Sequence, residues 1–198
     1  MNKNLGTFLA TLLIFSFATA QDFDASELEA FNSERLQINK RGMLVLGGWA
    51  LANIIASTIL ASRTSGVNKH FHQMNGYWNS INLIIGGFGY YSAITGGPGS
   101  LALSGSLDEQ HSIEKILLFN TGLDLAYVTA GLYLNERGMR RTNDRLMGFG
   151  RSLMLQGGFL FAFDLTLYLI HSKHGAALSG IVDQLAISEN GIGLIWKF

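Results

Sequence analysis

Four stretches of this chain stay apolar for about 20 residues each, and polar turns separate them. They are Met43–Ser62, Gly76–Thr95, Ile116–Leu134 and Ser152–His171. A helix rises about 1.5 Å per residue, so each stretch matches the roughly 30 Å of hydrocarbon in a bilayer. A soluble four-helix bundle is the alternative, but its helices would each show a broad charged face. The pattern therefore predicts an all-α fold, a four-span transmembrane helix bundle.

The first 20 residues have the pattern of a secretory signal peptide. Lys3 precedes the apolar run Leu5–Phe17, and Ala18-Thr19-Ala20 supplies small residues before a cleavage point at Gln21. The alternative is an uncleaved first transmembrane helix, but the run is shorter than a span requires. We expect residues 1–20 to be removed.

Residues 21–42 are predicted to contain an extramembrane amphipathic helix that lies along the membrane surface. Ser26 and Glu29 have the spacing of a capping box, and Leu28, Phe31 and Ile38 share one face. The transmembrane domain then covers residues 43–175.

The C-terminal tail, residues 176–198, breaks the helical pattern. Glycines that end helices are expected at Gly96, Gly138 and Gly175. After Asn190-Gly191, apolar residues alternate from Ile192 to Phe198, which predicts a short extramembrane β strand, or a hairpin with residues 185–187.

The connection between the third and fourth spans gives an orientation. Residues 135–151 contain five arginines, and positive loops face the cytoplasm. Both mature termini would then lie outside the cytoplasm, which agrees with a cleaved signal peptide. We expect a multi-pass protein of the bacterial cell envelope. The inner membrane is favoured, and the alternating strand ending in Phe198 leaves the outer membrane as an alternative.

Composition excludes several classes of protein. Charged residues make up 14% of the chain and the net charge is zero, so no basic field indicates nucleic-acid binding. The chain contains no cysteine, which excludes disulfides, thiolate catalysis and cysteine-ligated metals. No phosphate-binding loop, nucleophile–base set or cofactor motif is present. An enzyme is the least favoured class, and no cofactor is identified.

Polar residues within the spans fall on stripes at helical spacing. Such side chains usually face other helices, where they form hydrogen bonds. The ligand or ion candidates are Asn53 in the first span, Asn79 and Asn82 in the second, Asn120 and Asp124 in the third, and Asp164 in the fourth. For the asparagines, helix packing is the favoured role.

Asp124 and Asp164 are different, because a carboxylate near mid-membrane must be protonated, paired or bound to a cation. No Lys or Arg lies within the central spans to pair with them. Both residues lie at similar depth on helices expected to run antiparallel, so their carboxyl groups could face each other. Two such groups cannot both ionise without a cation. We therefore expect a shared proton or a bound cation.

Histidines give a weaker metal hypothesis. His171 and His174 lie three residues apart near the end of the fourth span, and His111 lies in a loop on the same side. Together they could bind zinc or copper. The alternative is ordinary histidines at helix ends.

The stretch His70-Phe71-His72-Gln73-Met74-Asn75-Gly76-Tyr77-Trp78-Asn79, with Asn82 and the Asn120/Asp124 pair, resembles uncharacterised four-helix bacterial membrane proteins of a domain-of-unknown-function family. That resemblance implies a four-helix membrane fold and no known activity. The favoured function is a non-enzymatic membrane protein whose polar core binds or conducts a proton, a cation or a small polar ligand. The alternative is a structural subunit that packs with itself or with a membrane partner. The expected partners are the lipid bilayer and another membrane protein or a second copy, not nucleic acid.

Overall fold

The computed structural model describes residues 25–188, with side chains described as far as residue 178. This part of the chain is all-α and contains no strand. Its elements are α2 (Ala25–Arg63), α3 (Gly66–Thr95), the short 3-10 helix η2 (Pro98–Ser100), α4 (Leu103–Arg140) and α5 (Asp144–Ser188). The all-α prediction is confirmed for these residues.

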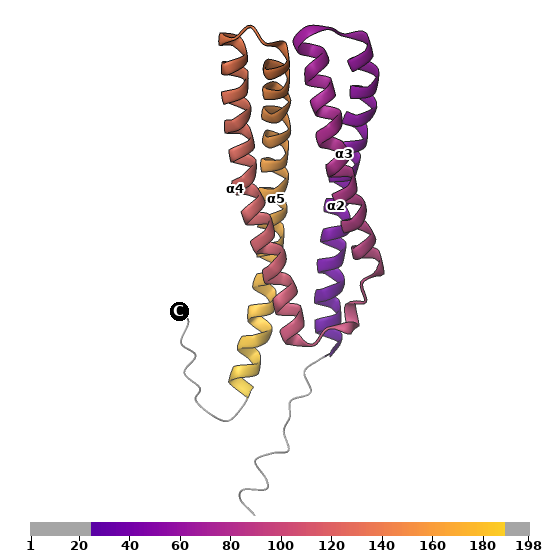
Figure 1. Cartoon of the computed structure of the whole chain (residues 1–198). Coiled ribbons are helices and arrows are strands. Elements are labelled where there is room, and N and C mark those ends of the chain that lie inside the picture. The colour runs from indigo at the N-terminus through magenta and orange to yellow at the C-terminus, as the bar shows by residue number, and fades with distance from the viewer. Residues whose placement is uncertain (1–24, 189–198) are drawn as a thin grey trace, which may run out of the picture.

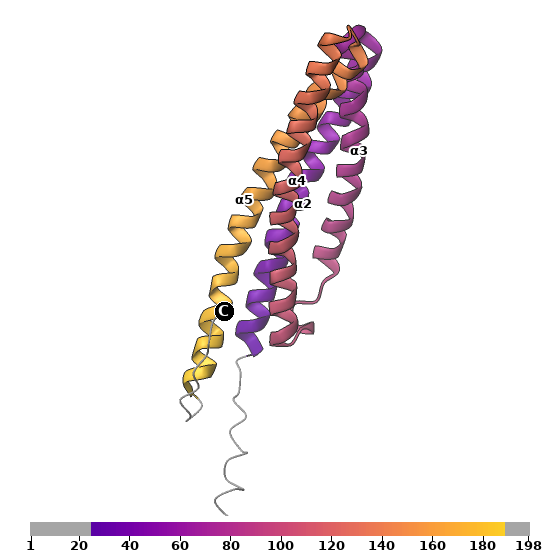
Figure 2. The ribbon, with the colours of Figure 1, turned by 60° about the vertical axis from the view of Figure 1, so that its left-hand side comes forward.

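The helices form two long antiparallel hairpins, α2–α3 and α4–α5, that lie side by side (Figure 1). Both hairpin turns are at one end, called here the turn end. The connection through η2 is at the other end, called here the open end (Figures 1 and 2). Asn143 begins α5 at the turn end, because its side-chain oxygen accepts a hydrogen bond from the Leu146 N–H at 3.0 Å.

Glycines set the close packing of α4 against α5. Gly131 lies so close to the partner helix that an added Cβ would be 2.7 Å from the Gly150 carbonyl oxygen. At Gly157 an added Cβ would be 2.9 Å from the Asp124 carbonyl oxygen. Buried residues recur every seven positions on both helices, as in a coiled coil. They are Asp124, Gly131 and Gly138 on α4, and Gly150, Gly157, Asp164 and His171 on α5.

The α2–α3 hairpin also contains a glycine that permits close packing of its two helices. An added Cβ at Gly86 would be 3.2 Å from the Gly47 backbone nitrogen, so the two backbones pass closely. Helix α5 joins the hairpins, since the Phe159 ring stacks on Trp49 of α2 at 3.9 Å between centroids. At the turn end, Gly148 of α5 contacts the backbone of Val67 and Phe71 on α3.

Three helices are long and apolar enough to cross a membrane: α2, α4 and the Asp144–Leu178 part of α5. Helix α3 is not among them, so only three of the four predicted spans are supported in this way. The outer surface of the described bundle is rich in large apolar side chains. Leu44, Ile55, Ile81, Phe88, Phe119 and Leu132 are each more than half exposed. An apolar exterior around a polar interior is compatible with a membrane protein.

Some predicted boundaries were wrong. The segment 25–42 continues into the first predicted span as one helix, and Leu28 and Phe31 on its apolar face are buried in the bundle rather than facing a membrane surface. Helix α4 passes through Gly138, where an added Cβ would be 2.6 Å from the Met147 backbone nitrogen. Gly138 therefore permits helix contact and does not end the helix.

The fourth helix also runs further than predicted. Helix α5 passes Gly175, whose Cβ position is 2.6 Å from Glu114 Oε1, and continues to Ser188. Residues 185–187 are therefore helical, and the predicted hairpin with them is wrong. The strand predicted over 192–198 and the signal peptide lie outside the described residues. The prediction that a helix ends at Gly96 is confirmed, because Gly96 is the C-cap of α3.

Candidate functional site

The carboxyl groups of Asp124 and Asp164 meet inside the bundle. Asp124 lies on α4 and Asp164 on α5, with exposed fractions of 2% and 7%. The two side chains lie close enough to interact directly. A hydrogen bond between two carboxyl groups requires a proton on one of them. The geometry therefore fits a pair that shares one proton, or a pair that binds a cation in its place.

This carboxyl pair lines a pocket of about 530 Å³. The wall combines a few polar side chains with a larger apolar surface. The polar or aromatic-polar residues are Trp78, Asn82, Asn120, Asp124, Tyr127 and Asp164, and the apolar ones include Leu46, Ile81, Leu160 and Phe163. Small-molecule sites have this character and size, since a few polar groups orient a ligand against apolar walls.

Three polar atoms at this pocket lack partners within the described part of the chain. Asn82 Nδ2 and Trp78 Nε1 donate no hydrogen bond, and Asp124 Oδ2 accepts none from any N–H or hydroxyl. Asn82 is 5% exposed, so bulk water does not satisfy its amide. Unpaired buried polar groups are costly, typically about 1–3 kcal/mol each. The presence of three unpaired polar atoms at one pocket indicates a site that accepts a polar ligand or water.

Asn53 and Asn79 lie outside this pocket, in a second buried network nearer the turn end. Asn75 Nδ2 donates to Asn53 Oδ1 at 2.8 Å and to Ser57 Oγ at 3.0 Å, and Asn79 Nδ2 donates to the Asn75 carbonyl at 2.8 Å. Gln156 completes the network: its Nε2 donates to Asn75 Oδ1, and its Oε1 accepts from Trp49 Nε1 at 3.0 Å. This network ties α2, α3 and α5 together, which is the packing role predicted for asparagines.

Gln156 is fully buried and was missed in the sequence. A signal was present, because it is the one amide side chain within the predicted span Ser152–His171. A lone amide inside an apolar span needs a hydrogen-bond partner on another helix.

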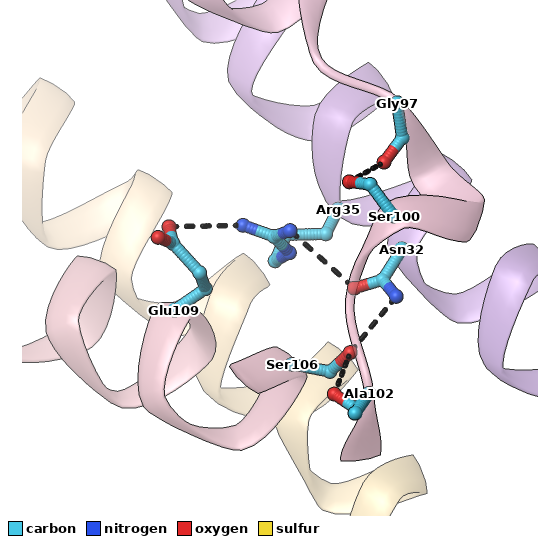
Figure 3. A network of polar contacts seen from close by, with 7 residues as sticks. All are labelled: Asn32, Arg35, Gly97, Ser100, Ala102, Ser106 and Glu109. Carbon is cyan, nitrogen blue, oxygen red and sulfur yellow. Dashed lines mark hydrogen bonds and ion pairs between the residues drawn. The ribbon is translucent and has the colours of Figure 1, made fainter. Parts of the chain in front are cut away.

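A third polar cluster lies at the open end (Figure 3). Asn32 Nδ2 donates to Ser106 Oγ at 2.9 Å, and Arg35 Nη1 pairs with Glu109 Oε2 at 3.4 Å. Arg35 also donates to Asn32 Oδ1 at 3.3 Å. Arg35 precedes the predicted span Met43–Ser62, and burial lowers its pKa while the Glu109 carboxylate opposes the shift. These contacts hold the start of α2 against α4.

The three histidines of the metal hypothesis are not brought together. His111 is exposed. His174 Nε2 lies 3.1 Å from the Phe31 carbonyl and its Nδ1 lies 3.6 Å from Glu34 Oε2, while His171 is fully buried with neither ring nitrogen bonded. No group of three His, Asp or Glu side chains suited to a metal occurs among residues 25–178.

Comparison with known proteins identifies the family of this chain. Residues 45–165 match the model of a family of unknown function (DUF6992), which is more than half of the chain. The chain belongs to this family. No curated protein and no solved structure matches it.

The matched region of this DUF6992 chain contains every residue of the carboxyl pocket except Met43. It also contains the Asn75–Gln156 network. The buried His171 and His174, by contrast, lie beyond it. The resemblance seen in the sequence is thus confirmed, and the family adds no assigned activity to either cluster.

Proposed function

We propose that this chain is a non-enzymatic, four-span protein of the cell envelope that holds a proton or a cation at the Asp124–Asp164 pair. Helix α3 is the fourth span in this proposal. It lies along α2 for most of its length (Figure 1), and its outer face carries Ile84, Phe88 and Ile94, each more than half exposed. A helix of that kind within a membrane bundle would contact lipid on one side and the polar core on the other.

The carboxyl pair carries the proposal. Its two groups are buried and lie next to each other, and no Lys, Arg or His lines their pocket. Without an internal counter-charge, the pair must take its positive charge from outside the chain, as a proton or a cation. Binding of that charge is the elementary step of a receptor or a transporter.

Structural assembly is the second candidate. The Asn75–Gln156 network shows that buried amides join three helices through hydrogen bonds between side chains. A packing role would require only hydrogen bonds, so an amide would serve at position 124 as well as a carboxyl group does.

Thermal melts of wild type and Asp124→Asn distinguish the two candidates. If the folded pair holds a proton that the unfolded chain releases, unfolding is favoured as pH rises and the wild-type Tm falls. Each kcal/mol lost would lower Tm by about 2–4 °C in a chain of this size. Asp124→Asn removes the neighbouring carboxyl group and can donate its amide N–H to the Asp164 carboxylate, so its Tm should fall less steeply as pH rises.

The same melts are repeated with sodium, potassium, calcium or zinc ions. A cation that replaces the proton should restore the wild-type Tm at high pH and leave Asp124→Asn unchanged. Indistinguishable melts for both proteins under every condition would mean that the pair serves packing alone, and the proposal would fail.

A further inference from the structure

We propose that the pocket at the carboxyl pair binds a monovalent organic cation, an ammonium group on an apolar body. This inference rests on the proposed function, because it names the ligand class of the same site. Three features of the pocket carry it: its charge, its walls and the side on which it opens.

The charge of the pocket fits one positive charge. A pair of carboxyl groups that shares a proton carries a single negative charge, and no cationic side chain lines the pocket to neutralise it. A ligand with one positive charge would remove the cost of that buried charge. An anion or a neutral apolar molecule would leave it in place.

The walls favour an organic cation over a calcium ion. Calcium takes six to eight oxygen ligands at about 2.3–2.6 Å, in a compact cage. Here nine of the fifteen lining residues are apolar, and the space is about 530 Å³. Such a volume would accept an organic molecule whose ammonium group approaches the carboxyl groups.

Aromatic rings stand beside the carboxyl groups. Trp78 and Tyr127 pack edge to face at 4.8 Å between centroids, and Phe163 lines the same pocket. Aromatic faces attract ammonium groups, most strongly where water is excluded. The unpaired Trp78 Nε1 and Asn82 Nδ2 are donors, so they could also bind an acceptor atom on the body of the ligand.

The pocket opens toward the apolar exterior, between α3 and α4. The backbones of these two helices do not approach closely within the described part of the chain, and Trp78 and Tyr127 meet across the gap between them. Ile81 and Ile85 of α3 and Ile116 of α4 line the pocket, yet each is more than half exposed. In a bilayer this rim would face hydrocarbon, so a ligand with an apolar body could enter from the lipid and bring its charge to the pair at the back.

Calorimetric titration of the protein in lipid nanodiscs tests the proposal. The probe is benzyltrimethylammonium, which stays a cation at every pH, and its neutral isostere neopentylbenzene has the same shape. Empty nanodiscs give the blank. We expect the cation to bind and the isostere to bind with an affinity about tenfold lower or less. Only the cation carries a charge that neutralises the carboxyl pair.

Two variants and a pH series sharpen the test. The double variant Asp124→Asn/Asp164→Asn should lose cation binding by about tenfold or more, whereas Ser152→Ala, a buried change on α5 outside the pocket, should bind as wild type. The circular dichroism spectrum shows whether each variant is folded. The cation needs the single negative charge of the pair, so its affinity should fall by up to about tenfold per unit as decreasing pH protonates the second carboxyl group.

Each other outcome overturns the inference. Equal binding of cation and isostere would mean that the pocket accepts any apolar molecule, including lipid. Cation binding that survives in the double variant would place it elsewhere. No cation binding, together with a wild-type Tm that depends on pH more steeply than that of Asp124→Asn, would leave the proposed function standing with the proton alone. If the cation does not bind and the Tm does not depend on pH, both this inference and the proposed function fail.

Discussion

Asn75 joins three helices through one amide group. Its nitrogen donates to Asn53 and Ser57 on α2, and its oxygen accepts from Gln156 on α5. All three partners lie inside the bundle or at its inner edge, where water cannot replace a lost bond fully. The residue therefore acts at a point where α2, α3 and α5 converge.

We expect Asn75→Ala to lower the free energy of unfolding by about 1–3 kcal/mol, because it leaves the Gln156 amide buried without its acceptor. Ser80→Ala is the control, since Ser80 is exposed and bonds only to the Gly76 carbonyl of its own helix. Denaturant titration in detergent micelles gives both values. Equal stability of the two variants would show that the network contributes nothing measurable.

The sequence predicted which polar residues lie inside the bundle. It predicted less well which side chains each of them contacts. Spacing alone placed Asn75, Asn79 and Asn82 on one face of a helix, and all three are buried. It did not separate Asn82, at the carboxyl pocket, from Asn79, in the packing network. That difference depends on which helix lies opposite each turn, and a single helix pattern does not contain it.

At the scale of elements, the hairpin α4–α5 depends on glycines that permit backbone contact. Gly131→Ala should destabilise the protein by about 1–3 kcal/mol, because the new methyl group would overlap the Gly150 carbonyl and Met154. Gly122→Ala on the same helix is a matched control, since nothing lies within 4 Å of its Cβ position. It should be neutral or stabilising, because alanine favours a helix.

Thermal melts of the two alanine variants give the comparison directly. A Gly131→Ala protein as stable as Gly122→Ala would mean that α4 and α5 adjust freely, contrary to the close packing described.

The four long helices were predictable from periodicity, whereas most of their ends were not. Gly96 ends α3, while Gly138 and Gly175 lie inside helices that continue past them. All three are glycines near the end of an apolar run. They differ in their surroundings, because Gly138 faces the backbone of α5 too closely for a side chain and Gly175 faces the Gln110 and Glu114 side chains of α4.

At the scale of the whole molecule, the two ends of the bundle should lie on opposite sides of the membrane. The arginine-rich connection 135–151 predicts that the turn end is cytoplasmic. Because the chain has no cysteine, single cysteines report the topology without background. We expect Ser100→Cys, at the exposed open end, to react with a membrane-impermeant maleimide in spheroplasts.

Ser62→Cys is the paired control, at the exposed turn end of α2. It should react only after the membrane is permeabilised. Labelling of Ser62→Cys but not Ser100→Cys in intact spheroplasts would reverse the orientation, and labelling of both would argue against a bundle that crosses the membrane.

The seven-residue spacing on α4 and α5 has a consequence for how the hairpin assembles. If α5 slid along α4 by one repeat in the direction that brings Gly150 opposite Asp124 and Gly157 opposite Leu117, a glycine would still lie at each contact, so glycine contacts alone permit more than one register. The carboxyl pair does not permit it. A slide of seven residues displaces the helix by about 10 Å, which would leave Asp124 and Asp164 as two isolated carboxyl groups among apolar side chains. The aspartates thus disfavour this register although it fits sterically, as a buried polar residue does in a coiled coil.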